Sequence, residues 1–136
     1  MKNQSDLEKL IPDFEDFKKV LWSYKNIIDT GKLTEYYCSI LFGLTLTTPR
    51  NYYFDALTSE NKKVEVKHRF YSGNIPPGMK IKLENIDVIY YVELEPNLLP
   101  KRIYKFLSED ITYTMNGRVS FQNAFNSHKA EVVYSS

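Results

Sequence analysis

Two short segments carry the main structural signal of this chain: Phe54-Asp55-Ala56, and then Lys62-Lys63-Val64-Glu65-Val66-Lys67. The second segment alternates polar and apolar residues, and side chains two residues apart on a β-strand project from the same face. Glu65 and Lys67 therefore share one face of a predicted strand. The two valines point to the other face, where they anchor the strand in the core.

The residues around this segment predict a β-hairpin. Residues 52–57 form the first predicted strand, residues 58–61 the turn, and residues 63–70 the antiparallel partner. Asp55 lies inside the apolar run of the first strand, where an unpaired carboxylate would be energetically costly. We therefore expect a partner or a metal ion beside Asp55.

Two helices are predicted before the hairpin. Apolar residues recur at steps of three and four over residues 13–28, which predicts an amphipathic helix that ends near Gly31. Residues 33–44 predict a second helix, with Thr34 as its N-cap and Gly43 as its C-terminal stop. Glu35 would then lie in the first turn of this second helix.

The rest of the chain predicts further strands and a mixed tail. The glycines and prolines of residues 73–78 predict a loop, and the nearly continuous apolar run of residues 86–94 predicts a central strand buried on both faces. Residues 102–106 alternate polar and apolar side chains and predict another strand, and Ser108 with the acids that follow it predicts the start of a helix. Asn116-Gly117 predicts a turn, and residues 121–133 predict a weak helix or a mixed tail. This order predicts an α/β sheet with helices packed against it.

Composition narrows the class of protein. A chain of 136 residues that is 43% hydrophobic is expected to form one domain, residues 1–136. The polar N-terminus and the absence of a long apolar run predict a cytoplasmic protein with no membrane partner. The single cysteine, Cys38, cannot form an internal disulfide and is expected to pack in a helix.

Charge is informative through its distribution. The formal net charge of +1 gives no global support for nucleic-acid binding. Between Lys62 and Lys82, however, the basic residues are opposed only by Glu65. Such a patch suits a phosphate backbone, although a run of charge is also typical of an ordinary solvated face.

The hairpin carries the side chains of a metal-dependent phosphodiesterase site. Asp55 and Glu65 supply the oxygen ligands that Mg²⁺ prefers, and the backbone carbonyl of Val66 is a further candidate ligand. Lys67 could orient a metal-bound water, donate to the phosphate or take a proton. The alternative is that Glu65 and Lys67 form an ordinary same-face pair on a surface strand and that Asp55 is a polar residue at a strand end.

With these residues in place, the chain resembles the PD-(D/E)XK nuclease superfamily. The resemblance rests on residues 35–44, 50–56, 63–67 and 86–92 and covers roughly residues 33–106 as a pattern of elements. It implies a restriction-endonuclease-like fold, which is a mixed central sheet of about four to five strands flanked by helices. Asp55, Glu65 and Lys67 match the catalytic residues of the group, and Glu35 matches an acid that often assists the metal site; Phe54 replaces the proline of the motif.

The resemblance implies a Mg²⁺-dependent or Mn²⁺-dependent DNA endonuclease that hydrolyses phosphodiester bonds in restriction, defence, repair or junction resolution. A homodimer, or a subunit of a larger nuclease system, is the expected assembly. The alternative from another class is a catalytically inactive nuclease-fold module that binds nucleic acid or a protein partner. An acid/base enzyme for a small molecule has little support, because the chain has no Gly-rich phosphate loop or nucleophile motif.

Several side chains are candidates for nucleic-acid contacts. They are Arg50, Lys63, His68, Arg69, Lys80 and Lys82. His68 should face away from Glu65 and Lys67 on a regular strand, which favours a structural or phosphate-contact role over metal ligation. Glu93 and Glu95 lack a basic companion in the sequence and are expected at a solvated strand end.

Overall fold

The structure is a computed structural model that describes residues 1–48, 53–114 and 117–136. Its largest element is a six-stranded mixed sheet with the strand order β1-β2-β3-β5-β6-β9. The strands are β1 Thr45–Leu46, β2 Ala56–Leu57, β3 Lys63–Phe70, β5 Val88–Leu94, β6 Pro100–Leu107 and β9 Glu131–Ser135. Only β3 and β5 pair in parallel among these neighbours. The sheet exceeds the expected four to five strands because the short β1 and the C-terminal β9 extend its two edges.

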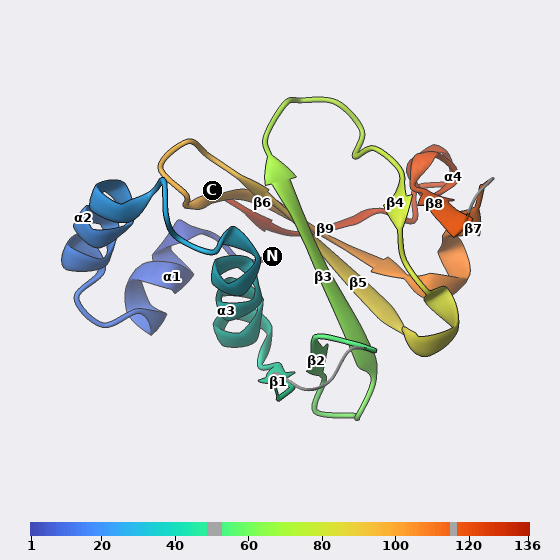
Figure 1. Cartoon of the computed structure of the whole chain (residues 1–136), viewed down its shortest axis with the longest axis horizontal. Coiled ribbons are helices and arrows are strands. Elements are labelled where there is room, and N and C mark those ends of the chain that lie inside the picture. Colours follow the sequence, from blue (N-terminus) through green and yellow to red (C-terminus); the bar gives the residue numbers. More distant parts are fainter. Residues whose placement is uncertain (49–52, 115–116) are drawn as a thin grey trace.

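The two faces of this sheet are covered by different elements. Helices α1 (Gln4–Leu10), α2 (Phe14–Tyr24) and α3 (Thr30–Phe42) lie on one side. A small sheet of order β4-β8-β7 lies on the other side with α4 (Figure 1). Its strands are β4 Met79–Lys80, β7 Thr112–Tyr113 and β8 Arg118–Ser120, and α4 is Gln122–Asn126. No helix in the described part of the chain is both long enough and apolar enough to cross a bilayer.

Strand β5 separates two hydrophobic cores. Its residues Val88, Tyr90 and Val92 pack with the helices, whereas Ile89 and Tyr91 pack with the small sheet and α4. All seven residues of β5 are buried, which confirms the prediction of a central strand buried on both faces. The site-bearing strand β3 lies directly beside it.

Helix α3 begins earlier than predicted. The side chain of Asp29 accepts a hydrogen bond from the Lys32 amide and caps the helix, so Thr34 is not the N-cap. Gly43 ends the helix in the left-handed region with φ 65°, as predicted. Because α3 starts at Thr30, Glu35 lies in its second turn and not its first.

The N-terminal prediction was wrong in one respect. The helix predicted for residues 13–28 ends at Tyr24, and Gly31, which was expected near its end, belongs to α3. A separate helix, α1, precedes it and was not predicted. Asn3 and Asp6 form a reciprocal capping box at the start of α1, and this short motif was the available signal.

The other predicted elements have mixed outcomes. The antiparallel hairpin is confirmed, but β2 is only Ala56–Leu57, and residues 49–52 lie outside the described part. The loop at residues 73–78 and the strand at residues 102–106 are confirmed, the latter within β6. Ser108 begins a single 3₁₀ turn, Ser108–Asp110, without a side-chain cap. The tail contains α4 and then β9, and Asn116 of the predicted turn is outside the described residues.

Candidate active site

Strand β3 presents Glu65 and Lys67 together, as the alternating pattern predicts. Their side chains are half-buried, and Lys67 Nζ lies 3.3 Å from Glu65 Oε1. Val64 and Val66 are buried in the core beneath α3. The strand is held in register by its parallel pairing with β5, so the direction of the two charged side chains is fixed by the sheet.

Asp55 lies at the edge of β3, directly before β2. Its Oδ2 accepts a hydrogen bond of 2.8 Å from the Val66 amide, and its own amide donates to the Val64 carbonyl at 2.8 Å. The expected partner of Asp55 is therefore the backbone of β3. The Val66 carbonyl points to the same edge as its amide, because the two groups of one strand residue share an edge.

Asp55 links the carboxyl groups of α3 and β3. Burial and the neighbouring Asp55 raise the pKa of Glu65 to about 7, while the ammonium group of Lys67 acts in the opposite direction and lowers this pKa. Burial and Asp55 also raise the pKa of Glu35 on α3. Hydrogen bonding with Asp55 contributes to both shifts. The helix and the strand thus bring Glu35 and Glu65 to the same aspartate.

The donor chemistry of this cluster fits a divalent cation. Three carboxyl groups and a carbonyl are hard oxygen ligands, and burial, together with the neighbouring Asp55, raises the pKa of two of the carboxyl groups. Within residues 1–48, 53–114 and 117–136, no group of three His, Cys, Asp or Glu side chains is arranged to hold a metal ion. A cation would therefore have to draw these side chains closer together.

A cleft of about 250 Å³ opens beside Glu65. Tyr53, Lys80 and Lys82 also line it, together with Ile81, Asn85 and Ile86. Glu65 supplies the acidic wall, and the two lysines supply the basic wall. Larger hollows of about 650, 490, 480 and 330 Å³ are lined by none of the predicted catalytic residues, although Lys80 and Lys82 also line the one of 490 Å³.

The predicted nucleic-acid contacts divide into two sets. Lys63, Lys80 and Lys82 are exposed, and the last two border the cleft. Arg50 lies outside the described residues. His68 faces the helix side, as predicted, where its Nε2 is hydrogen-bonded to Thr30 Oγ1 at 2.9 Å, and burial lowers its pKa.

Arg69 is engaged within the protein. Its Nη2 lies 2.8 Å from Glu93 Oε2, and Glu93 is only 1% exposed. The expectation of a solvated Glu93 was therefore wrong. The basic companion that Glu93 lacks in the sequence reaches it from the neighbouring strand, because Arg69 and Glu93 are in register across the parallel β3–β5 pair.

From the sequence, Tyr53 is a candidate for stacking on a nucleic-acid base, with half-buried packing in the strand as the alternative. Tyr53 is 66% exposed and lines the cleft with Glu65.

A scan against protein-family models finds no match for this chain, and a search of curated proteins finds none. The case for function therefore depends on the geometry of the site.

Proposed function

We propose that this chain is a metal-dependent nuclease of restriction-endonuclease-like fold that hydrolyses phosphodiester bonds in DNA. The observation that carries the proposal is the meeting of Glu35 and Glu65 at Asp55. Carboxyl oxygens can hold the divalent metal that assists phosphodiester hydrolysis, and the neighbouring lysine can contact the water or the phosphate. The mixed sheet, with α3 packed against β3, is consistent with this fold.

The proposed metal ligands are Asp55, Glu65, Glu35 and the Val66 carbonyl, and the metal is Mg²⁺ or Mn²⁺. When bound, the metal supplies charge stabilisation and lowers the pKa of water. Glu65 holds Lys67 beside the cluster, 3.3 Å from its own carboxylate, so that the ammonium group can orient the attacking water and the phosphate.

The cleft supports a polyanionic substrate. Lys80 and Lys82 line it together with Glu65, so a phosphate that enters meets two basic side chains beside one carboxyl group of the cluster. During hydrolysis the water oxygen bonds to phosphorus, the bond to the leaving oxygen breaks, and that oxygen takes up a proton. Tyr53 at the mouth offers an aromatic face on which a base can stack.

The test is cleavage of plasmid and branched DNA with Mg²⁺ or Mn²⁺ by the wild type, Asp55→Asn and Lys67→Ala. Of these three proteins, we expect only the wild type to cleave the DNA. Glu60→Gln, which changes an exposed glutamate in the turn before β3, is the matched control and should cut normally. Equal cleavage by the wild type and the Asp55 and Lys67 variants would refute the proposal.

A second candidate is a non-catalytic module that binds nucleic acid or a protein. It is favoured by the engagement of the carboxyl groups with the protein itself, since Asp55 accepts from the Val66 amide and Glu65 pairs with Lys67. Calorimetry with Mn²⁺ separates the two candidates. A nuclease should show a heat of Mn²⁺ binding that Glu65→Gln abolishes, whereas a non-catalytic module should show none. The homodimer and the cytoplasmic location stay predictions, and sedimentation velocity tests the first.

A further inference from the structure

The basic wall of the cleft is carried by an exposed connection. Residues 71–78 leave the end of β3, arch away from the sheet and descend into β4, where Lys80 lies (Figure 1). Most of these residues are exposed, and Pro76 is buried. Few packing contacts therefore hold the connection, so polar contacts must fix its course.

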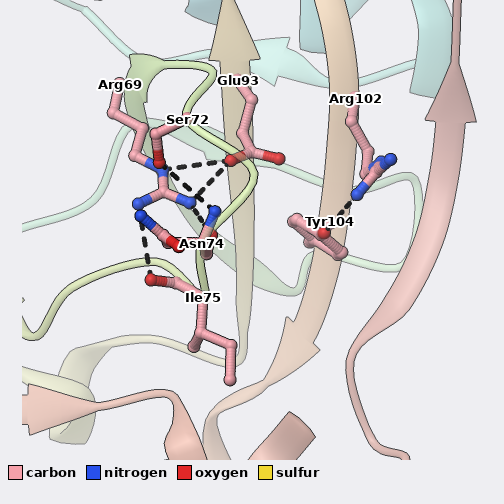
Figure 2. Close-up of polar contacts among 7 residues, drawn as sticks. All are labelled: Arg69, Ser72, Asn74, Ile75, Glu93, Arg102 and Tyr104. Atoms are coloured by element: carbon pink, nitrogen blue, oxygen red, sulfur yellow. Dashed lines mark hydrogen bonds and ion pairs between the residues drawn. The ribbon is translucent and has the colours of Figure 1, made fainter.

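Arg69 is the first of these polar contacts. Its Nε and Nη2 donate to Glu93 Oε2 at 3.0 and 2.8 Å, which fixes the guanidinium on the sheet (Figure 2). The same guanidinium donates through Nη1 to the Ile75 carbonyl at 3.4 Å and through Nη2 to the Asn74 carbonyl. Figure 2 shows it lying between Glu93 and the connection. Arg69 thus joins a buried carboxylate to the backbone of an exposed segment.

A second anchor lies at the far end of the connection. Arg118 of β8 donates through Nη2 to the Gly78 carbonyl at 2.5 Å. A side chain at Gly78 would meet the Val119 carbonyl oxygen at 2.5 Å, so the two backbones approach each other there as closely as glycine allows. Arg69 and Arg118 therefore hold the middle and the end of the connection, and the Tyr71 amide holds its start by donating to the Leu94 carbonyl at 2.9 Å. Lys80 and Lys82 follow its end.

Burying the Glu93 carboxylate costs free energy, so its presence in the core indicates a role other than stabilising the fold. It is 1% exposed, and its Oε1 has no hydrogen-bond partner in the described part of the chain. An apolar residue at this position would avoid that penalty, since buried ion pairs add little net stability. What the carboxylate provides is a fixed orientation for the guanidinium of Arg69.

We infer that Arg69 and Glu93 are positioning residues that hold the connection so that Lys80 and Lys82 line the cleft beside Glu65. The inference rests on the proposed function, because it assigns those lysines to nucleic-acid binding. Arg69 acts through the connection and does not touch the substrate. Arg102 of β6 donates through Nη1 at 2.9 Å to the Tyr104 hydroxyl (Figure 2), and its guanidinium lies 5.6 Å from the centre of the Tyr71 ring at the start of the connection.

The structural half of the test needs no activity. The variant is Arg69→Met combined with Glu93→Gln, which removes both charges and so leaves no unpaired buried charge. Chymotrypsin should cleave after the exposed Tyr71 several-fold faster in this variant than in the wild type, because the connection has lost its first anchor. Lys105→Met is the matched control, because Lys105 of β6 lies in register with Tyr90 and not with Glu93, and this variant should be cleaved at the wild-type rate. An unchanged rate in the double variant would overturn the inference.

The functional half measures Kd for a fluorescent DNA duplex, and KM and kcat for its cleavage. The double variant should raise Kd and KM several-fold and leave kcat unchanged. In a background that carries Lys80→Gln and Lys82→Gln, the same change should have no further effect, because a positioning residue acts through those lysines. An equal effect in both backgrounds, or no effect on Kd, would overturn the inference. Binding without cleavage by the wild type would refute only the nuclease proposal, and absence of binding would refute both.

Discussion

Glu65→Gln should stabilise the metal-free protein at alkaline pH. The Glu65 side chain is 19% exposed, and its pKa is raised from 4.5 to about 7 in the folded protein. The folded state therefore binds this proton more tightly than the unfolded state does. The resulting stabilisation is fully present below pH 4.5 and is lost as the pH rises to about 7.

The magnitude follows from the size of that shift. A shift of one pKa unit corresponds to 1.36 kcal/mol, so the change from 4.5 to about 7 corresponds to at most about 3 kcal/mol. Most of this loss falls between pH 5 and pH 8. Glutamine does not titrate, so the unfolding free energy of the variant relative to the wild type should increase by about 2 kcal/mol over this interval.

Urea unfolding at pH 5 and pH 8 with a chelator present measures this difference. Glu60→Gln is the control, because it removes an exposed carboxyl group near the same strand, and its effect should be similar at both pH values. A divalent cation at pH 8 should stabilise the wild type more than Glu65→Gln, since a ligand stabilises the state that binds it. A free-energy difference between Glu65→Gln and the wild type that stays the same at both pH values would refute the raised pKa of Glu65.

Three further predictions concern other parts of the molecule. Tyr37→Phe should lower the unfolding free energy by about 1–3 kcal/mol in urea titrations, because it removes the 2.7 Å bond to the buried Leu98 carbonyl. Gly78→Ala should destabilise the protein in thermal unfolding, since its Cβ would meet a backbone carbonyl of β8 at 2.5 Å; a melting temperature equal to that of the wild type would contradict the close approach. Lys80→Gln with Lys82→Gln should reduce the slope of log Kd for duplex DNA against log salt by about 1–2, because each phosphate contact contributes about 0.9. A slope equal to that of the wild type would remove these lysines from the interface.

Local pattern was sufficient for the elements whose signals lie within a few residues. The alternation at residues 63–70 predicted β3 with its bounds, and the apolar run at residues 86–94 predicted β5 as a central strand. The strand period also placed Glu65 and Lys67 on one face. These features follow from backbone geometry, which repeats every two residues regardless of what packs around it.

The N-terminus shows where local pattern fails. The break after Tyr24 depends on Asp29, which caps α3 and so fixes its start before Gly31. Capping competes with the periodic pattern that continues through residues 27 and 28. The edge strands β1 and β2 are only two residues long, too short to produce a periodic signal.

The sequence by itself determined the central strands and the shared face of Glu65 and Lys67, because both follow from the two-residue period of a strand. Only the tertiary structure decided which distant residues meet: Glu35 and Glu65 at Asp55, and Arg69 with Glu93. The first meeting depends on the packing of α3 against β3, and the second on the register of a parallel strand pair. Such contacts join residues far apart in the chain, so they are fixed by the packing of whole elements and not by any local spacing.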